Sequence, residues 1–292
     1  FGIPVLGTMA HSWVMSFDEE IDAFREYVRQ YHDNLILLAD TYNVLEMGVP
    51  HAIQVFKELK EEGRLPGKYG IRIDSGDIAY LSQEATRMFT EAGFPDAIIS
   101  GSNDLDEYTI QSLKAQGCTV TSWGVGTKII TADGTSALGG VFKMAVKEAD
   151  GKEVPVMKFS NDVEKMTNPG IKTVYRFYKK DTGKMITDLV CLRDEKAADG
   201  GDFTLVTESA KWRRKELKAG TYTVEELLRP VVENGRNLPL PALSEIIRYA
   251  DKQIDTLWPE YTRLLNPDLM EINLSDKLQT LKSELIRREL GE

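Results

Sequence analysis

Five short apolar runs recur along the first half of the chain, each followed by polar or glycine residues and then by an amphipathic segment. The runs begin about 24 to 34 residues apart, which is the length of a strand–helix unit. Strands that are apolar throughout are buried on both faces. The alternation therefore predicts a parallel sheet covered by helices, either a barrel or a doubly wound open sheet. The five predicted strands are residues 3–7, 35–39, 69–73, 97–100 and 120–125.

The residues that follow these runs favour the barrel. Every predicted strand ends in residues that can react or bind phosphate, as the loops at the carboxyl ends of barrel strands do. An open sheet concentrates such residues at one switch point. We therefore predict an α/β fold in which residues 1–141 form part of an irregular barrel. The chain begins at Phe1 inside an apolar run, which we interpret as the later portion of a longer protein.

After residue 141 the pattern changes. Apolar runs flank Asp150-Gly151 and Asp181-Thr182-Gly183, so residues 142–222 are predicted to be rich in β-hairpins. Thr223 and Glu226 have the spacing of a helix capping box, and apolar stripes of helical period follow. Residues 223–292 are therefore predicted to be a helical C-terminal region that contributes to a second domain.

Charge and cysteine content restrict the class of partner. The net charge of −10 argues against a nucleic acid or a membrane as partner, because a polyanion is repelled by such a surface. It does not argue against a phosphate ligand, whose site is local. Cys118 and Cys191 have no paired spacing, so we expect reduced thiols in a cytoplasmic protein. No targeting leader is visible.

The third predicted strand ends in a charged, glycine-containing turn, Arg72-Ile73-Asp74-Ser75-Gly76-Asp77. Arg72 and Asp74 lie two apart on a strand, so both side chains project from the same face. Asp77 is placed to cap the next helix. A guanidinium and a carboxylate at the carboxyl end of a strand suit a phosphorylated sugar, although a structural ion pair with a helix cap explains the turn equally well.

The first two strand ends carry a histidine and an aspartate. His11, in a turn of small residues, could act as a general base, a phosphate donor or a phosphoryl acceptor, because imidazole titrates near neutral pH. A structural role is the more frequent one for a lone histidine, and we assign that role to His32 and His51. Asp40 is either a ligand for ribose or magnesium or a helix cap, and we prefer the cap.

The last two strand ends are rich in small residues. Gly101 and Ser102 allow close backbone approach to a ribose, or form a plain tight turn. Gly124, Gly126 and Thr127, followed by a lysine, could hold a phosphate with backbone N–H groups. Each signal is weak alone, but a barrel would bring all five strand ends to one mouth. The combination predicts a site for a phosphoribosyl compound.

Three motifs together resemble the nicotinate phosphoribosyltransferase family: residues 7–13 (GTMAHSW), 72–77 (RIDSGD) and 124–127 (GVGT), with Asn168-Pro169-Gly170 further on. The resemblance implies a type II phosphoribosyltransferase, with an irregular α/β barrel beside a second domain. It also implies transfer of the phosphoribosyl group from phosphoribosyl pyrophosphate to nicotinate, giving nicotinate mononucleotide and pyrophosphate in NAD salvage. Hydrolysis of ATP would be coupled to this reaction through a phosphohistidine at His11, and a homodimer is implied.

The same resemblance assigns roles to the other motif residues. Arg72 and Asp74 would contact the ribosyl and pyrophosphate groups, and Asp74 or Asp77 would hold Mg²⁺. Transfer to nicotinamide or quinolinate is the alternative reaction, and a non-catalytic phosphate-binding fragment is the alternative from another class. The remaining substrate contacts would be Gly101 and Ser102 at the ribose, and Gly124, Gly126 and Thr127 at the 5′-phosphate.

Overall fold

The computed structural model of the chain describes residues 3–31, 33–160, 165–197, 201–207 and 214–291. Its contacts divide the chain into a first unit, Ile3–Leu138, and a second unit formed mainly by Gly139–Glu292. This boundary lies close to the expected one at residue 141, whereas residues 142–222 and 223–292 share one unit. His32 and residues 198–200 lie outside the described part. Within that part, no helix has the length and apolar character needed to span a membrane.

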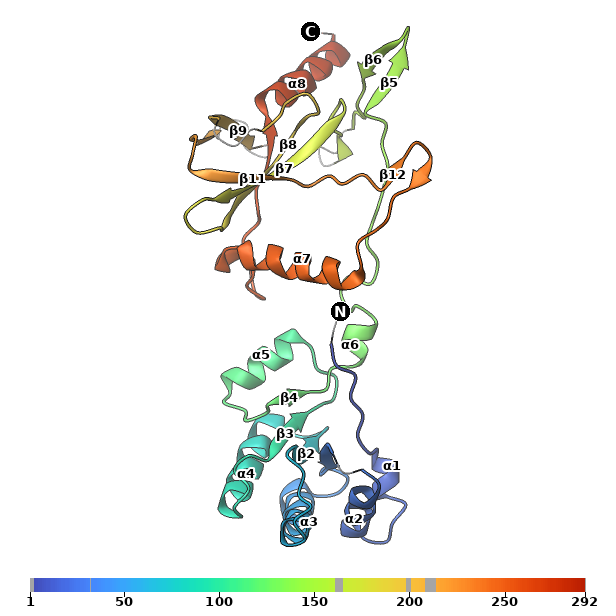
Figure 1. Ribbon diagram of the computed structural model, residues 1–292, viewed down its shortest axis with the longest axis vertical. Helices are drawn as coiled ribbons and strands as arrows, with labels where there is room; N and C mark the ends of the chain where they lie inside the picture. The colour runs from blue at the N-terminus through green and yellow to red at the C-terminus, as the bar shows by residue number, and fades with distance from the viewer. Residues whose placement is uncertain (1–2, 32, 161–164, 198–200, 208–213, 292) are drawn as a thin grey trace. The chain divides into compact units, whose positions relative to one another are not determined.

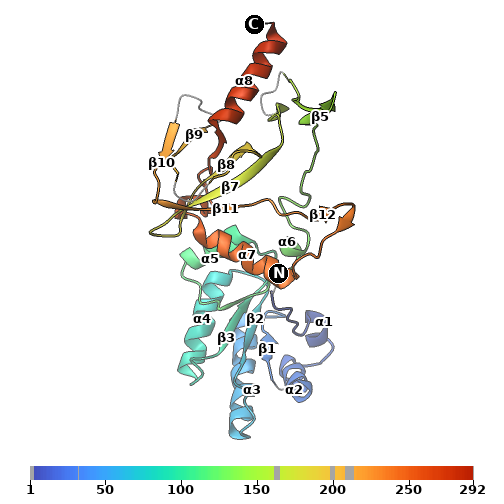
Figure 2. The ribbon, with the colours of Figure 1, turned by 45° about the horizontal axis from the view of Figure 1, so that its top comes forward.

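A parallel sheet forms the centre of the first unit (Figures 1 and 2). Its strands follow the order β1-β2-β3-β4, so each strand pairs with its neighbour in the chain. The helices between them bury an apolar stripe, and the aromatic rings of Phe56, Phe89 and Phe94 pack together in the core. The elements are α1 (His11–Val14), α2 (Glu20–Gln30), β1 (Leu35–Leu38), η1 (Val44–Gly48), α3 (Val49–Glu61), β2 (Tyr69–Ile73), α4 (Ile78–Glu91), β3 (Ile98–Gly101), α5 (Glu107–Ala115), β4 (Ser122–Trp123) and α6 (Thr127–Ile130).

The structure corrects the prediction for the first apolar run. Residues 3–10 form neither helix nor strand, and Val5 and Leu6 are 96% and 70% exposed. The physical reason is that Pro4 has no N–H to donate to a ladder, which disfavours a strand there. The α/β character is confirmed. Over the described residues, however, the parallel sheet has four strands and is open, not a closed barrel.

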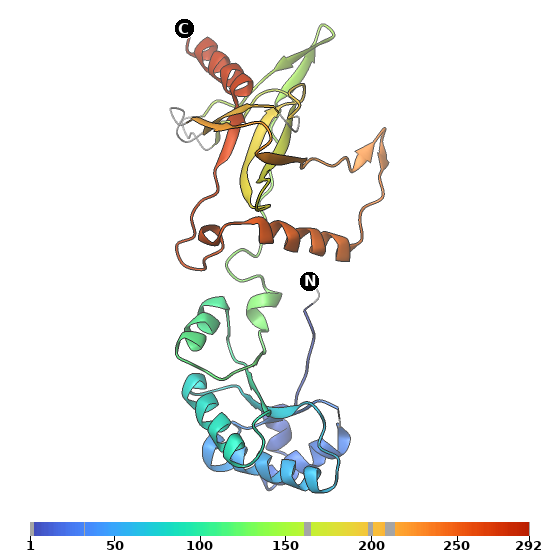
Figure 3. The same ribbon diagram turned by 60° about the vertical axis from the view of Figure 1, so that its left-hand side comes forward.

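The second unit is built on a mixed six-stranded sheet with the order β10-β9-β14-β8-β7-β11. Helix α8 packs against β8, β9 and β14 (Figure 3). Tyr175, Phe177 and Tyr222 lie in a separate hydrophobic core. The elements are β5 (Val146–Ala149), β6 (Lys152–Pro155), β7 (Lys172–Lys179), β8 (Met185–Leu192), β9 (Phe203–Thr207), β10 (Arg214–Leu217), β11 (Tyr222–Glu226), β12 (Val232–Glu233), β13 (Arg236–Asn237), α7 (Leu243–Thr256), η3 (Pro259–Tyr261), β14 (Ile272–Ser275) and α8 (Asp276–Leu290).

Both predicted hairpins form, as β5–β6 and β7–β8. The prediction that residues 223–292 are helical holds for α7 and α8 but not for the strands β11, β12, β13 and β14. Thr223 lies opposite Tyr178 in the pairing of β11 with β7. Strand β14, which follows α7 and precedes α8 in the sequence, lies in the middle of the sheet between β9 and β8. The capping-box spacing of Thr223 and Glu226 is overridden by the pairing of β11 with β7, because tertiary contacts outweigh local propensity.

Candidate active site

The carboxyl ends of β1, β2 and β3 bring an arginine, two aspartates and a serine together. Arg72, the fourth residue of β2, donates from Nε to Ser102 Oγ at 2.8 Å and from Nη1 to Thr8 Oγ1 at 2.7 Å. Its Nη2 lies 3.1 Å from Asp74 Oδ1, and Ser102 Oγ donates to that same oxygen. The predicted placement of Arg72 and Asp74 on one face is therefore confirmed. The guanidinium joins three separate segments of the chain.

Asp40 lies behind this cluster and links it to the histidine. Its side chain is 2% exposed, and its Oδ2 accepts from the Asp74 backbone N–H at 3.0 Å and from Ser75 Oγ at 2.5 Å. Its Oδ1 lies 3.4 Å from His11 Nε2. The preferred interpretation of Asp40 as a helix cap is wrong, because the side chain of Asn43 caps the helix that follows.

The electrostatics of the cluster keep Asp74 ionised. Partial burial acts to raise the pKa of its carboxyl group, but the hydrogen bond from Ser102 and the charge of Arg72 outweigh burial, with a smaller contribution from His11. The net result is a pKa below the usual value for aspartate. Asp74 therefore presents a negative charge at neutral pH next to the guanidinium of Arg72.

Glycine allows the fourth strand end to approach the cluster. The Gly124 N–H donates to the Gly101 carbonyl at 2.8 Å. A Cβ on Gly124 would lie 3.1 Å from Ser102 Cβ, closer than side chains normally pack. The backbone after β4 therefore lies directly against the serine that Arg72 contacts, and three of the five predicted substrate-binding residues in this region are neighbours.

The other predicted site residues lie apart from this cluster. Asp77 is exposed and accepts from the Tyr80 N–H at 3.0 Å, which confirms it as the cap of α4. Gly126 precedes the four-residue helix α6, which begins at Thr127. In the described ranges, none of Asp77, Gly126 and Thr127 has a hydrogen bond or ion pair to the cluster.

Sequence reasoning missed Thr8 and undervalued Asp40. Asp40 follows β1, which is buried at all four positions, just as Asp74 follows β2. This equivalent position after a buried strand could have indicated that Asp40 belongs to the site. Thr8 gave no comparable signal, because its part of the chain forms no strand and is held by the contact of its hydroxyl with Arg72.

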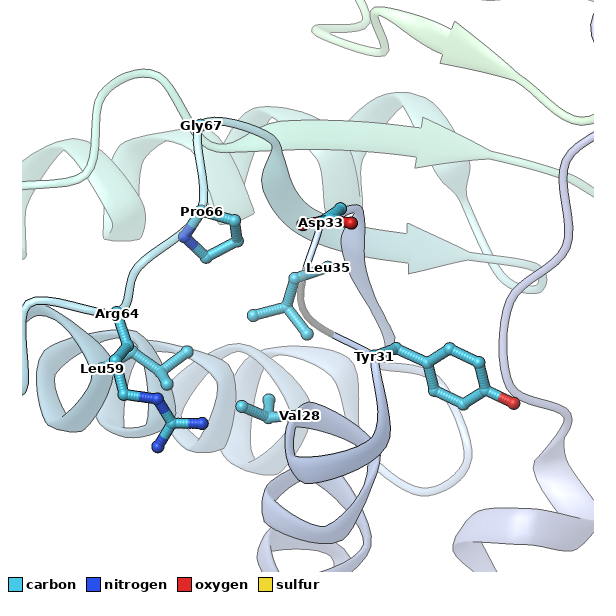
Figure 4. Close-up of a pocket in the computed structure, with 8 residues that line it drawn as sticks. All are labelled: Val28, Tyr31, Asp33, Leu35, Leu59, Arg64, Pro66 and Gly67. Atoms are coloured by element: carbon cyan, nitrogen blue, oxygen red, sulfur yellow. The ribbon is translucent and has the colours of Figure 1, made fainter.

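Two cavities lie on the first unit. One of about 420 Å³ lies at the amino ends of β1 and β2 (Figure 4). The polar cluster lies at the carboxyl ends of the strands. The other, of about 760 Å³, includes Thr8 and therefore borders the cluster. The first is lined by Val28, Tyr31, Asp33, Leu35, Leu59, Arg64, Pro66 and Gly67, and the second by Gly7, Thr8, Met9, Ala10, Trp13, Tyr27, Gln30, Tyr31, Asp33 and Asn34.

Sequences of known proteins can be aligned with most of this chain. It is 38% identical over 290 residues to nicotinate phosphoribosyltransferase of Bacillus subtilis (strain 168), covering 98% of this chain and 57% of the relative. It is 34% identical over 270 residues to nicotinate phosphoribosyltransferase 2 of Arabidopsis thaliana, covering 89% and 47%. The chain thus spans about half the length of the curated relatives it matches.

Solved structures agree with the sequence relatives. A crystal structure of human nicotinic acid phosphoribosyltransferase matches with a TM-score of 0.76 and 27% identity, covering 97% of this chain and 62% of the human chain. Nicotinate-nucleotide pyrophosphorylase from Pyrococcus furiosus shares the fold, with a TM-score of 0.57 and 21% identity over 87% of this chain and 56% of that chain. Residues 171–282 match the family model described as the nicotinate phosphoribosyltransferase C-terminal domain. These comparisons confirm the resemblance: the chain is similar to the nicotinate phosphoribosyltransferases over most of its length, and residues 171–282 match the C-terminal domain of that family.

Proposed function

We propose that this chain provides catalytic residues of an enzyme that transfers the phosphoribosyl group of phosphoribosyl pyrophosphate to nicotinate. The products would be nicotinate mononucleotide and pyrophosphate, in NAD salvage. The observation that carries the proposal is the single cluster in which Arg72, Asp74, Ser102, Asp40 and His11 meet at the carboxyl ends of parallel strands. The related enzymes named above support the same reaction class.

The chemistry of this transfer suits the charges of the cluster. The bond from the anomeric carbon to pyrophosphate breaks, and a bond to the pyridine nitrogen forms. Positive charge therefore develops on the sugar and negative charge on the leaving group. The guanidinium of Arg72 would balance the pyrophosphate, and the ionised carboxylate of Asp74 would stabilise the sugar cation. Both groups are held in place by neighbours before substrate arrives, which reduces the reorganisation needed in the transition state.

His11 is the proposed phosphoryl acceptor for coupled ATP hydrolysis. Its Nε2 faces Asp40 Oδ1 at 3.4 Å, which leaves Nδ1 as the nitrogen available for phosphorylation. A carboxylate behind the imidazole favours the N–H on the facing nitrogen and stabilises the ring when it gains positive charge. Asp40 is therefore proposed as the partner that orients His11.

Magnesium would be held through substrate and not by the protein alone. Within the described ranges, no group of three or more histidine, cysteine, aspartate or glutamate side chains is arranged to hold a metal ion. Mg²⁺ in nucleotide sites is bound by one or two carboxylates together with substrate phosphates. Asp74 fits that arrangement, whereas one carboxylate oxygen of Asp77 is engaged in capping α4. The ion would neutralise charge on the pyrophosphate.

Further chain would complete the barrel. Among the residues that the structure describes, strand β1 pairs on one side only, and all four of its residues are buried. A strand added at its free edge, and others beyond it, would close the sheet as the resemblance implies. We also propose the second domain and the homodimer that go with that fold. Sedimentation of the complete protein, with a single species of twice the monomer mass, is the expected result for the dimer.

The test is an assay of the complete protein with nicotinate, nicotinamide and quinolinate side by side. We expect nicotinate mononucleotide to form, faster when ATP is present. Replacing His11 by alanine should remove the stimulation by ATP, and the exposed Asp22→Asn variant should retain it. Unchanged stimulation by ATP in His11→Ala would contradict the proposed phosphohistidine. Faster reaction with nicotinamide or quinolinate would mean that nicotinate is not the acceptor.

A non-catalytic binding role is the second candidate, because the chain spans only about half of its relatives. Calorimetry with phosphoribosyl pyrophosphate separates the two. Binding that requires Arg72, without formation of any pyridine nucleotide, would favour the binding role.

A further inference from the structure

Two stretches of the first unit are joined by a pair of imidazole–carboxylate contacts. The first stretch contains α1 and α2, and the second runs from the end of β1 through α3. His11 Nε2 lies 3.4 Å from Asp40 Oδ1, and His51 Nδ1 lies 2.7 Å from Glu20 Oε2. Each stretch thus supplies one imidazole and one carboxylate. The first contact lies in the candidate active site, and the second has no assigned role.

Glu20 is unusually buried for an acidic residue. Its side chain is 0% exposed, and its Oε1 has no hydrogen-bond partner among the described residues. Burial raises the pKa of its carboxyl group, the contact with His51 lowers it, and the charge of Asp40 raises it again. Asp40 is therefore close enough for the two carboxyl groups to interact. Burying a carboxyl group costs free energy of desolvation unless a hydrogen-bond partner offsets it. The position of the Glu20 side chain is therefore tied to that of His51.

Glu20 is mechanically connected to His11 through α2. The indole Nε1 of Trp13, two residues after His11, donates to the carbonyl of Ala23 at 3.2 Å. Ala23 lies one turn after Glu20 and is fully buried. Helix α1, which begins at His11, is thus attached to the first turn of α2, the turn that Glu20 begins.

His51 is connected to Asp40 in the same way. His51 lies in the first turn of α3, which begins after Gly48. A Cβ on Gly48 would lie 2.0 Å from the carbonyl oxygen of Ala39, the residue before Asp40. The start of α3 therefore packs directly against the end of β1. The contact between Glu20 and His51 thus joins the two elements that carry His11 and Asp40.

We propose that Glu20 is a positioning residue: its contact with His51 aligns α1 and α2 with the end of β1, so that His11 faces Asp40. The inference rests on the proposed function for the use of His11, but the alignment itself is measurable without any reaction. A second polar contact, between Arg25 and Glu58 at 2.7 Å, joins the same two helices. It is a two-bond contact whose side chains are about 40% exposed, so it provides a solvent-exposed control for the buried contact.

The first measurement is the rate at which diethyl pyrocarbonate modifies His11 in the full chain, followed by peptide mass spectrometry. Glu20→Ala should raise this rate about tenfold, as expected for loss of a buried, charge-assisted hydrogen bond. Glu20→Gln retains a hydrogen-bonding group for His51 and should stay close to the parent rate. Glu58→Gln should also leave the rate unchanged.

A control for general destabilisation is needed, because Glu20→Ala also lowers stability. Val28→Ala, in the last part of α2, removes buried methyl groups about two turns away from Glu20 and also lowers stability. It should leave the rate at His11 unchanged. Equal acceleration in Val28→Ala and Glu20→Ala, or none in either, would overturn the positioning role.

The second measurement is steady-state kinetics of the complete protein. Glu20→Ala should lower the ATP-stimulated kcat about tenfold while the KM for phosphoribosyl pyrophosphate stays within about twofold, because Arg72 and Asp74 are not displaced. Glu20→Gln should restore kcat. A parent protein without transferase activity would remove the proposed function, and the modification rates at His11 would still decide the positioning role.

Discussion

Replacing Asp74 by asparagine removes one negative charge from the cluster and keeps the size of the side chain. The amide oxygen can still accept from Ser102 and Arg72, but the hydrogen bond from Ser102 becomes a neutral one and the ion pair with Arg72 becomes a hydrogen bond to a neutral acceptor. Hydrogen bonds to charged groups are worth about 1.5 to 3 kcal/mol, and neutral ones about 0.5 to 1.5 kcal/mol. The Asp74 side chain is 27% exposed, which keeps the loss at the low end, about 1.5 kcal/mol at pH 7.

The effect has a definite dependence on pH. Although burial acts to raise it, the pKa of Asp74 is lowered in the folded protein from the ordinary value for aspartate by the hydrogen bond from Ser102 and the charge of Arg72. Its stabilising contribution is therefore fully present above the unfolded value and is lost as the pH falls through the folded value. The deficit of Asp74→Asn should be constant between about pH 6 and 8 and should shrink below about pH 4.

Hydrogen exchange of the β2 peptides, followed by mass spectrometry, measures this loss in the first unit alone. A loss of about 1.5 kcal/mol corresponds to exchange about tenfold faster at pH 7. The control is Asp22→Asn, whose carboxylate is 57% exposed and pairs with Arg25, and which should change exchange by less than about twofold. Equal effects of the two variants at pH 7, or a deficit of Asp74→Asn that grows in acid, would refute the reasoning.

Three further experiments test the packing inside each unit. Gly48→Ala places a Cβ 2.0 Å from the Ala39 carbonyl oxygen and should destabilise the first unit by about 3 kcal/mol, seen as faster exchange of β1; exchange at the parent rate would contradict the close approach. Arg176→Met leaves the buried carboxylate of Asp188 without its two-bond partner and should destabilise the second unit by about 3 kcal/mol in exchange of β7 and β8, whereas a loss below about 1 kcal/mol would mean that solvent replaces the guanidinium. Burial raises the pKa of the Cys191 thiol to about 12, so iodoacetamide should not alkylate it at pH 8 unless the protein is unfolded, and rapid labelling of the folded chain would count against that burial.

The strand–helix alternation predicted most of the first unit correctly, because its signal is local. A run such as Tyr69–Ile73 is apolar, ends at a charged turn and precedes an amphipathic helix, and the structure places β2 on those residues. The cap at Asp77 was predictable for the same reason. The segment before Thr8 looked equally strand-like, but Pro4 lacks a ladder donor, and whether a segment pairs as a strand depends on tertiary contacts that its own sequence does not show.

In the second half, the two hairpins and the helices α7 and α8 agree with the sequence patterns, whereas β11 and β14 do not. Thr223 and Glu226 carry a helix signal that is real over four residues, but β7 offers a ladder of partners, and the longer-range pairing prevails. Pairing of β14 between β8 and β9 joins segments more than sixty residues apart, which no local pattern reports.

By itself, the sequence determined the chemical types present and the ends of the strands on which they lie: an imidazole, a guanidinium and carboxylates after apolar runs. Only the tertiary structure decided which of them meet. It brought Thr8 and Asp40 to the cluster and left Asp77 and Gly126 outside it. The physical reason is that side-chain type and local propensity are properties of neighbouring residues, whereas a contact such as Arg72 with Thr8, 64 residues apart, depends on how whole elements pack.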